Sequence, residues 1–347
     1  MHIYNKLLKW YNLQNINLPW RINTSSYRIW ISEIMLQQTQ VETVIPYYNK
    51  WMKIYPTLKD LSKADLDDLL YLWQGLGYYN RVKSIYNAVK MINDKFNGKI
   101  PNSYKLLISL NGIGDYTASA ILAIAFNKYY IPIDGNIKRI VSRVNKYNNS
   151  SKDLDSYKNF TQELVSKQKI GDSVQALMDL GRIICKPKIP LCDICPIQKN
   201  CLSYNDDVVD LFPKKIIRKK IPTYNVVVAY ILKGGKFLIS KRPKTGLLSN
   251  LWELPGGKIE KNETKEFSLL REVKEEINIT IKIEQEVGTI MHQYSHFKVI
   301  ITLFICTYKS GTAKPKASQA LKWINEKEKK EFAFPAATHK LFKLISK

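Results

Sequence analysis

Residues 106–126, LLISLNGIGDYTASAILAIAF, decide the fold together with residues 132–143, PIDGNIKRIVSR. The first stretch is an apolar segment that runs into a turn with two glycines, Gly112 and Gly114, and then into a second apolar segment of helical length. Glycines allow a tight turn and close backbone approach, and free N–H groups at the start of a helix can bind a phosphate oxygen. We therefore expect two helices joined by a phosphate-holding turn, although an ordinary pair of helices has the same local pattern.

The N-terminal part of the chain, residues 1–200, is a succession of predicted helices. Between residues 27 and 51 the apolar side chains recur near helical spacing, namely at Ile31, Ile34, Met35, Val41, Val44 and Ile45. The pattern changes after Cys201, where DLFPKKIIRKKIP at 210–222 is basic and bounded by prolines. This composition fits a linker near a phosphate backbone and an ordinary solvated spacer equally well.

The C-terminal part of the chain has the pattern of strands. Two β-branched runs, TYNVVVAYIL and KFLISKRP, flank the sequence KGGK at 233–236, which is typical of a hairpin turn. Further strands are predicted at 280–290 and 298–308. We therefore expect a multidomain chain with an all-α domain at 1–204, a linker at 205–221 and a separate α+β domain at 222–347.

The composition narrows the class of partner. The chain of 347 residues carries a formal charge of +24 and is 45% hydrophobic with seven Trp, which is enough for two packed cores. Such an excess of positive charge favours a polyanionic partner but does not choose among DNA, RNA and an anionic membrane. No stretch reaches the ~18 apolar residues of a spanning helix, and the N-terminal MHIYNKLLKWYN lacks the features of a signal peptide. We expect a cytoplasmic protein without membrane attachment.

Four of the five cysteines, Cys185, Cys192, Cys195 and Cys201, lie within seventeen residues at the spacing C-x6-C-x2-C-x5-C. In a reducing compartment such a group is available for metal rather than for disulfides. Four thiolates in one loop can ligate zinc or a [4Fe–4S] cluster, and the number of ligands does not separate the two. The fifth, Cys306, lies on a predicted strand and is expected to be a buried apolar residue.

Asp134 stands twenty residues after Gly114, at the entrance to the next predicted helix. The turn and this acid together resemble the helix-hairpin-helix glycosylase superfamily, and the resemblance implies that Asp134 is catalytic. Members with Lys two residues after the second glycine form a Schiff base and cleave the strand, whereas this chain has Tyr116 there. A phenol cannot form that imine, so we expect a monofunctional enzyme that leaves an abasic site. GIGDYTASAILAIAF with DGNIKR resembles the MutY family of adenine DNA glycosylases rather than its endonuclease III relatives.

WISEIMLQQTQVETVIPYY at 30–48 closely resembles the most characteristic block of the MutY family. Anionic adenine is a poor leaving group, so its removal needs an acid, and the resemblance assigns that role to Glu33. Without the resemblance Glu33 would be read as a surface helix residue. By the same resemblance Asp134 stays ionised and stabilises the oxocarbenium-like sugar. Tyr116 and Asn136 match positions that orient the two acids, while on the residues alone they fit a packing Tyr and a capping Asn.

An enzyme that acts on a base must extrude it from the stack and fill the vacancy with side chains. The resemblance assigns this work to Gln38 of LQQTQ and Tyr78 of WQGLGYYNRVKSI. Arg81, beside Tyr78, is expected to contact a phosphate. On the residues alone, Gln38 fits a polar surface residue and Tyr78 fits a packed loop aromatic. The resemblance also implies that the loop at 185–201 holds a [4Fe–4S] cluster, because the cysteine spacing coincides with that of MutY and endonuclease III.

The domain at 222–347 resembles the Nudix-like module of MutY proteins, which senses 8-oxoguanine opposite the adenine. RPKTGLLSNLWELP at 242–255 and HQYSHFKV at 292–299 carry the resemblance. It implies that Ser295 contacts the lesion, and the simpler interpretation of that loop is a strand end with a packed aromatic.

Within this domain GKIEKNETKEFSLLREVKEEIN at 257–278 retains a Nudix box whose last glycine is replaced by Asn278. The carboxylates of such a box can hold Mg²⁺ against a diphosphate, and a charged helix kept for stability is the alternative. The predicted Mg²⁺ ligands are Glu272, Glu275 and Glu276.

Together with these patterns, the resemblance to the MutY family implies a monofunctional adenine DNA glycosylase of base excision repair. We expect it to act as a monomer on double-stranded DNA with adenine opposite 8-oxoguanine or guanine, and to hydrolyse nucleotides as well if Mg²⁺ binds the Nudix box. One alternative is a nucleotide-pool Nudix hydrolase tethered to a DNA-binding module, against which the intact Glu33, Asp134 and four cysteines argue. Another is a catalytically silent lesion-binding protein, which would have lost one of the two acids.

Overall fold

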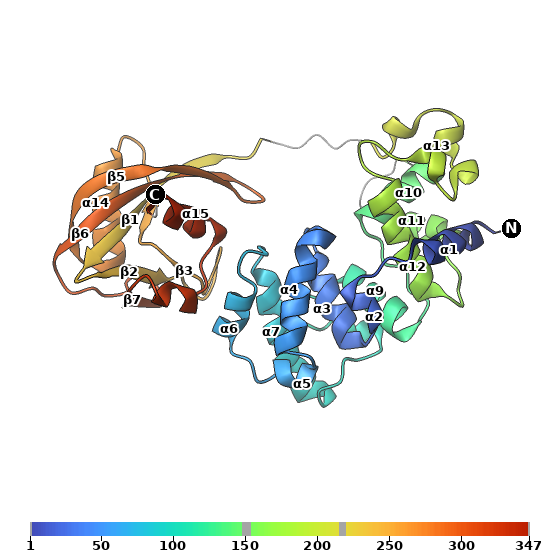
Figure 1. The fold of residues 1–347 in the computed structure, drawn as a ribbon, viewed down its shortest axis with the longest axis horizontal. Coiled ribbons are helices and arrows are strands. Elements are labelled where there is room, and N and C mark those ends of the chain that lie inside the picture. The colour runs from blue at the N-terminus through green and yellow to red at the C-terminus, as the bar shows by residue number, and fades with distance from the viewer. Residues whose placement is uncertain (1, 148–153, 215–219, 346–347) are drawn as a thin grey trace. The chain divides into compact units, whose positions relative to one another are not determined.

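The structure is a computed structural model that describes residues 2–147, 154–214 and 220–345 (Figure 1). Backbone contacts group the chain into two units, Met1–Lys63 with Ser84–Ile217 and Ala64–Lys83 with Arg218–Lys347. The sequence did not indicate that Ala64–Lys83 groups with the C-terminal strands. The division into domains at 205–221 stays a prediction, and residues 215–219 of that linker lie outside the described residues.

Up to residue 214 all regular elements of the described chain are helical, as expected. The elements are α1 (Ile3–Gln14), α2 (Pro19–Ile22), α3 (Ser26–Leu36), α4 (Val41–Ile54), α5 (Leu58–Leu61), α6 (Leu66–Leu72), α7 (Asn80–Phe96), α8 (Tyr104–Leu107), α9 (Asp115–Phe126), α10 (Gly135–Val144), α11 (Leu154–Gln162), α12 (Ile170–Asp179), the π-helical turn η1 (Leu180–Ile184), the 3-10 turns η2 (Cys192–Ile194) and η3 (Gln198–Asn200), α13 (Leu202–Asn205) and the 3-10 turn η4 (Val209–Leu211).

Local sequence explains where the helices around the later site begin and end. The Ser25 side chain accepts a hydrogen bond from the backbone N–H three residues on and so caps α3. The Asp134 carboxylate does the same for α10, at 2.7 Å from the N–H of Ile137. The apolar pattern across residues 31–45 is divided between α3 and α4, because the chain leaves the helix at 37–40 and Gln38 has a φ of 57°.

The core of the first unit forms where α1, α10 and α12 pack together. The buried side chains that these helices contribute include Leu7, Ile137, Ile140, Val174 and Leu177. Burying aliphatic side chains removes their surface from water, which is the main favourable contribution to folding. The polar ends of α10 and α12 are thereby held on a fixed scaffold.

The C-terminal strands of the second unit form one mixed sheet. The elements are β1 (Thr223–Lys233), β2 (Lys236–Lys241), β3 (Trp252–Glu253), β4 (Gly256–Lys258), α14 (Lys265–Ile277), β5 (Thr280–Gln293), β6 (Lys298–Ser310), β7 (Ala320–Ile324), the 3-10 turn η5 (Glu328–Glu331) and α15 (Ala336–Ile345). The main order is β3-β2-β1-β6-β5, in which β1 and β6 are parallel and the other pairs antiparallel. The predicted hairpin is confirmed, since Gly234 and Gly235 between β1 and β2 both have positive φ.

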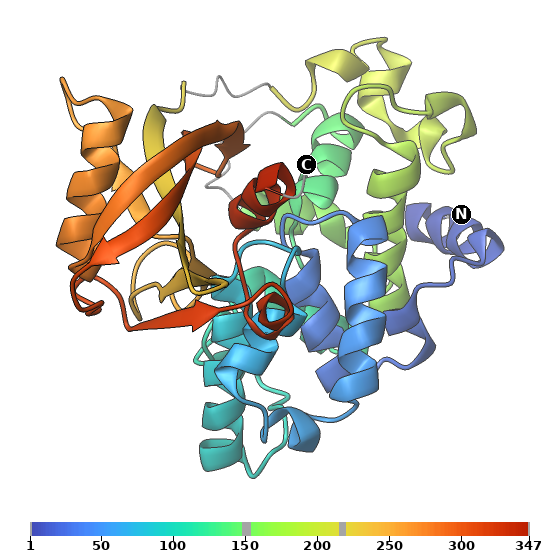
Figure 2. The same cartoon turned by 60° about the vertical axis from the view of Figure 1, so that its left-hand side comes forward.

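Helices cover both faces of this sheet, α14 on one side and α15 on the other (Figure 2). Side chains of β1 alternate between the two cores, with Val227 and Ala229 packed in the core with α14 and Val228 and Tyr230 in the core with α15. Cys306 on β6 is fully buried, as predicted. In the described part of the chain, no helix is long and apolar enough to cross a membrane.

Candidate active site

One pocket in the first unit gathers the predicted catalytic residues. It has a volume of about 620 Å³. Its lining includes Glu33 from α3, Tyr116 from α9, and Asp134 and Asn136 from the start of α10. These residues come from distant parts of the sequence, and the packing of three helices brings them to one cavity.

Glu33 is buried, with 4% of its surface exposed, and its Oε2 accepts a hydrogen bond from the Tyr116 hydroxyl at 2.8 Å. Burial raises the pKa of Glu33 to about 7, and the charge of Asp134 adds to this, while the Tyr116 hydrogen bond and Arg21 oppose it. Burial and both carboxylates raise the pKa of Tyr116 well above its usual range, so the phenol stays protonated. Glu33 therefore can hold a proton near neutral pH and release it, as a general acid must.

Asp134 is half-buried and oriented by two donors. Its Oδ1 accepts the Ile137 N–H at 2.7 Å and its Oδ2 accepts the Asn136 side-chain amide at 2.9 Å. Burial raises the pKa of Asp134, whereas these hydrogen bonds and the charge of Arg139 oppose the rise because they favour the ionised form. The carboxylate is thus fixed on the pocket wall in one orientation.

Arg139 joins this acid to the cysteine loop, and sequence reasoning missed it. Its Nη2 donates to Asn136 Oδ1 at 2.9 Å and to the Gly181 carbonyl at 2.7 Å, and its Nε donates to the Cys185 carbonyl at 2.7 Å. A Cβ at Gly181 would lie 2.5 Å from the Asn136 Cβ, so the close approach requires glycine. Local spacing carries no signal for this link, because Gly181 and Cys185 lie outside the helix α10 that carries Arg139.

A buried ion pair that was not predicted also lines the pocket. Arg21 Nη1 lies 2.5 Å from Asp179 Oδ2, and Arg182 Nη2 lies 3.3 Å from Asp179 Oδ1. Asp179 at the end of α12 is only 2% exposed. A buried carboxylate of this kind is stable only with such partners, because an unpaired buried charge costs several kcal/mol, ~3–5.

The turn between α8 and α9 contains the two glycines of the predicted phosphate-holding element. Gly112 has a φ of 77°, and a Cβ there would lie 2.4 Å from the Ser84 Cβ, so both conformation and space require glycine. Gly114 is the exposed N-cap of α9, and a Cβ there would meet nothing within 4 Å. The geometry suits an approaching anion, and the phosphate contact itself stays a prediction.

The two predicted wedge residues share an unusual backbone conformation. Gln38 has a φ of 57° and Tyr78 a φ of 49°, and both are exposed. Left-handed backbone in residues other than glycine is sparsely populated and gathers at functional sites. Their insertion into DNA stays a prediction.

Arg81 lies mostly inside the protein, with 8% of its surface exposed. Its Nη2 donates to the carbonyls of Leu76 and Gly77, and its guanidinium lies over the Tyr78 and Trp73 rings. Burial lowers the pKa of Arg81 to about 10. Arg81 thus holds the loop that presents Tyr78, and its predicted contact with phosphate stays a prediction.

The four clustered cysteines line one small cavity, together with Arg143. Arg143 is 3% exposed; its Nη1 donates to Cys185 Sγ at 3.3 Å and to the Lys186 carbonyl at 2.8 Å. Within the described ranges, no three Cys, His, Asp or Glu side chains converge closely enough to hold one metal ion. Four thiols around a common cavity, with a cationic donor to one sulfur, are a set of ligands that suits a metal centre, and the identity of that centre stays a prediction.

The loop between β5 and β6 presents the predicted lesion reader. Tyr294 and Phe297 pack on each other, with ring centroids 4.9 Å apart, and the Tyr294 N–H donates to the Phe297 carbonyl at 2.8 Å. Ser295 and His296 are left exposed at the tip of this loop. The arrangement makes the Ser295 hydroxyl accessible, and its contact with a base stays a prediction.

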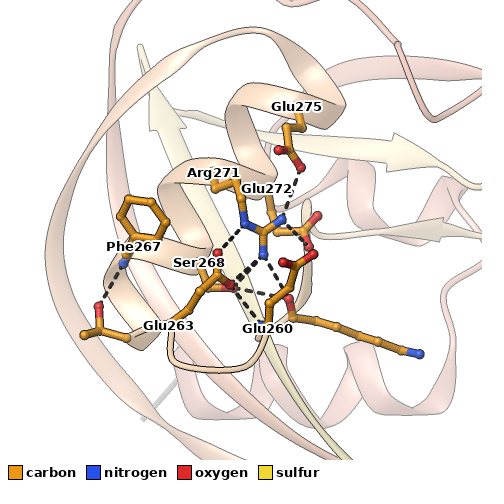
Figure 3. Close-up of polar contacts among 9 residues, drawn as sticks. Glu260, Glu263, Phe267, Ser268, Arg271, Glu272 and Glu275 are labelled. Carbon is orange, nitrogen blue, oxygen red and sulfur yellow. Dashed lines mark hydrogen bonds and ion pairs between the residues drawn. The ribbon is translucent and has the colours of Figure 1, made fainter.

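Arg271 occupies the centre of the Nudix box (Figure 3). Its guanidinium donates to Glu263 at 2.6 Å and to Glu272 and Glu275 at 3.1 Å each. Asn278 caps α14 with a φ of 59°, so it adopts the left-handed conformation that the glycine of the box would supply. The single departure from the box therefore leaves the local backbone intact.

Glu276 lies half-buried beside this cluster. Burial raises its pKa to about 7, with further contributions from the charges of Glu253 and Glu272. Two of the three predicted Mg²⁺ ligands, Glu272 and Glu275, are paired with Arg271 instead. The binding of Mg²⁺ by Glu272, Glu275 and Glu276, and the nucleotide hydrolysis it would allow, stay predictions.

Comparison with known proteins finds relatives over the full length of the chain. The chain is 33% identical, over 100% of its length, to the adenine DNA glycosylase of Buchnera aphidicola subsp. Acyrthosiphon pisum, of which it covers 98%. It belongs to the adenine DNA glycosylase family. The human adenine DNA glycosylase is 30% identical over 97% of the chain and 73% of that protein.

Both halves of this adenine DNA glycosylase family member match known domains. Residues 31–167 match the HhH-GPD superfamily of base excision DNA repair proteins, and residues 227–344 match the NUDIX domain. A thermostable thymine-DNA glycosylase superposes with a TM-score of 0.55 at 26% identity, covering 58% of this chain and 95% of that one. Endonuclease III in a non-covalent DNA complex superposes with a TM-score of 0.51 at 21% identity, covering 59% and 94%. The expected fold class, a helical glycosylase domain followed by a Nudix-like domain with a mixed sheet, is confirmed.

Proposed function

We propose that this protein excises adenine opposite 8-oxoguanine or guanine in duplex DNA by hydrolysing the N-glycosidic bond. The observation that carries the proposal is the buried Glu33, with a pKa raised to about 7, in the same pocket as Asp134. Two carboxylates in different environments can divide the work, one as proton donor and the other as a fixed negative charge. Family membership supports the choice of base.

In the proposed reaction Glu33 donates its proton to the adenine, at N7, while the bond from the sugar carbon to the base breaks. The base leaves with the electron pair of that bond, and the positive charge that develops on the sugar is stabilised by Asp134. Water then adds its oxygen to the sugar carbon and returns a proton to Glu33. Tyr116, which donates to Glu33 at 2.8 Å, and Asn136, which donates to Asp134 at 2.9 Å, keep the acids oriented.

The product of this reaction is an abasic site in an uncut strand. Tyr116 occupies the place where a bifunctional relative has its lysine, and its hydroxyl is engaged with Glu33. A phenol cannot form the imine that leads to strand cleavage. The protein is therefore monofunctional in this proposal, and its action as a monomer stays a prediction. The cytoplasmic location stays a prediction.

In this proposal some contacts position the DNA and others recognise the opposite base. The turn at Gly112 and Gly114 binds phosphate, Gln38 and Tyr78 fill the space that the extruded adenine leaves, and Ser295 reads the opposite 8-oxoguanine. The exposure of Gln38, Tyr78 and Ser295 supports these roles, and so does the left-handed backbone of Gln38 and Tyr78.

An excision assay tests the function and the reader together. Labelled duplexes with A opposite 8-oxoguanine, G or T are incubated with protein, and abasic sites are then cleaved by alkali. We expect alkali-dependent cleavage for the first two, and a smaller preference for 8-oxoguanine over G in Ser295→Ala, because that side chain contacts only the lesion base. Absence of alkali-labile sites would refute the function, cleavage without alkali would refute monofunctionality, and an unchanged preference would exclude Ser295 as the reader.

The cysteine cavity is proposed to hold a [4Fe–4S] cluster through Cys185, Cys192, Cys195 and Cys201. The cluster would fix the loop, whose exposed Lys186, Lys188 and Lys199 present positive charge to DNA. Its supporting observation is that the four thiols line one cavity, with Arg143 Nη1 3.3 Å from Cys185 Sγ.

Purified protein is therefore expected to be brown and to contain about four irons per chain when fully loaded. Cys195→Ala should lose most of this iron because it removes one ligand, whereas Cys306→Ala should keep it because Cys306 is buried in the sheet of the other unit. Elemental analysis and the visible absorption of anaerobically purified protein measure both. A colourless protein with one stoichiometric zinc would contradict the cluster.

A further inference from the structure

Asp179 is a buried carboxylate in the pocket that the proposed reaction does not use. It is 2% exposed, lies at the C-terminal end of α12, and pairs with Arg21 at 2.5 Å. Arg21 sits on the short helix α2, lines the same pocket as Glu33, and leaves only 13% of its side chain exposed. Among the described residues, Asp179 is the one carboxylate that forms an ion pair with Arg21, and the Tyr11 ring lies 5.6 Å from the guanidinium carbon.

The charge of Arg21 works against the acid. A cation near a carboxyl favours its ionised form, and Arg21 accordingly lowers the pKa of Glu33 against the larger effect of burial. In a low-dielectric pocket two charges interact strongly even without contact. Asp179 lies 2.5 Å from Arg21 and lines the same pocket, so its negative charge opposes the charge of Arg21.

The other charged and titratable groups around Glu33 each have a partner or an effect of their own. Tyr116 donates to Glu33 and stays protonated, and Asp134 raises the pKa of Glu33. Arg182 contacts Asp179 and also lies 3.6 Å from Glu42. The groups that line the pocket are Arg21 from α2, Glu33 from α3, Glu42 from α4, Tyr116 from α9, Asp134 at the start of α10, Asp179 from α12, Arg182 from η1 and Lys186.

We propose that Asp179 is a positioning residue for the acid: it fixes Arg21 in the pocket wall and cancels enough of its charge for Glu33 to stay protonated at neutral pH. The proposal rests on the role of Glu33 as proton donor. It assigns no contact between Asp179 and the substrate, so its effect should appear in the pH dependence of excision rather than in the chemistry itself.

The test is the single-turnover excision rate on an A:8-oxoguanine duplex from pH 5.5 to 9. In the wild type the rate should fall on the basic side as Glu33 loses its proton. In Asp179→Asn this fall should move to lower pH, since the amide keeps the shape but leaves the charge of Arg21 unopposed. A displacement of one pH unit corresponds to a rate about tenfold lower at pH 8 with little change at pH 5.5.

Matched variants separate charge from folding. Asp172→Asn makes the same change at an exposed position of the same helix and should leave the profile in place. Adding Arg21→Gln to Asp179→Asn should move the fall back toward the wild-type pH, because the unopposed cation is gone. Arg21→Gln alone should move it above the wild-type pH, which tests the proposal even if Asp179→Asn does not fold.

Three outcomes are distinct. A displaced fall in Asp179→Asn that the double variant reverses supports the proposal. A profile that coincides with the wild type, or an equal loss of rate at every pH, overturns it while leaving Glu33 as the acid. A wild-type protein without excision, or without any fall on the basic side, points instead to failure of the proposed function.

Discussion

Replacing Glu33 by Gln is expected to lower the single-turnover rate of adenine excision by about 10²–10⁴-fold, the usual contribution of a general acid. The amide keeps the size of the side chain and can still accept the Tyr116 hydroxyl, which lies 2.8 Å from Glu33 Oε2. It has no acidic proton to give to the leaving base. Binding of A:8-oxoguanine duplex, measured by fluorescence anisotropy, should therefore change little.

The same substitution should stabilise the protein above neutral pH, and this separates lost chemistry from lost folding. A folded-state pKa raised from 4.5 to about 7 means that the contribution of Glu33 to stability is present below pH 4.5 and is lost as pH rises through 7. The amide that replaces this carboxyl has no charge to bury at any pH. At pH 8 the free energy of unfolding should rise by roughly 3 kcal/mol, and at pH 4 the two proteins should be alike.

The matched control is Glu163→Gln, the same chemical change at an exposed position, which should alter neither the rate nor the pH dependence of the melting temperature. Appreciable turnover by the Glu33 variant would remove the acid assignment. Equal melting temperatures of wild type and Glu33→Gln at pH 8 would show that the ionised Glu33 carboxylate does not destabilise the folded protein.

Features that depend on neighbouring residues were predictable from the sequence. The two glycines before α9, the hairpin glycines 234 and 235, and the strand periods of β5 and β6 each express a local backbone or burial requirement. Asn278 belongs to this group, because its tolerance of the left-handed conformation is a property of the residue itself. The structure places each of these features where the pattern predicted it.

Features that depend on contacts between distant helices were not predictable. Arg139 reaches Gly181 and Cys185 from another helix, and Arg21 meets Asp179 across 158 positions of sequence. No periodicity marks such partners, because each Arg fits equally well as an ordinary surface cation of its own helix. Arg81 illustrates the same limit, since the sequence predicted a phosphate contact and did not indicate that the Leu76 and Gly77 carbonyls bind a mostly buried guanidinium.

Replacing Asp134 by Asn is expected to lower the excision rate by about 10²–10³-fold, comparable to the loss of one preorganised electrostatic partner of a transition state. The positive charge that develops on the sugar would face a neutral amide. Stability should change little, because Asn caps a helix about as well as Asp and can still accept the Ile137 N–H, which lies 2.7 Å from Asp134 Oδ1.

This combination of lost rate and retained fold distinguishes Asp134 from a residue needed only as the cap of α10. The measurement is single-turnover excision at several pH values together with thermal unfolding, with Asp94→Asn, at an exposed position of α7, as the matched control. The Asp134 variant should lose rate across the whole pH range, including the acid side, because a missing counter-charge cannot be replaced by a proton. Near-normal rates in Asp134→Asn would leave the carboxylate as a helix cap and require another group to stabilise the sugar.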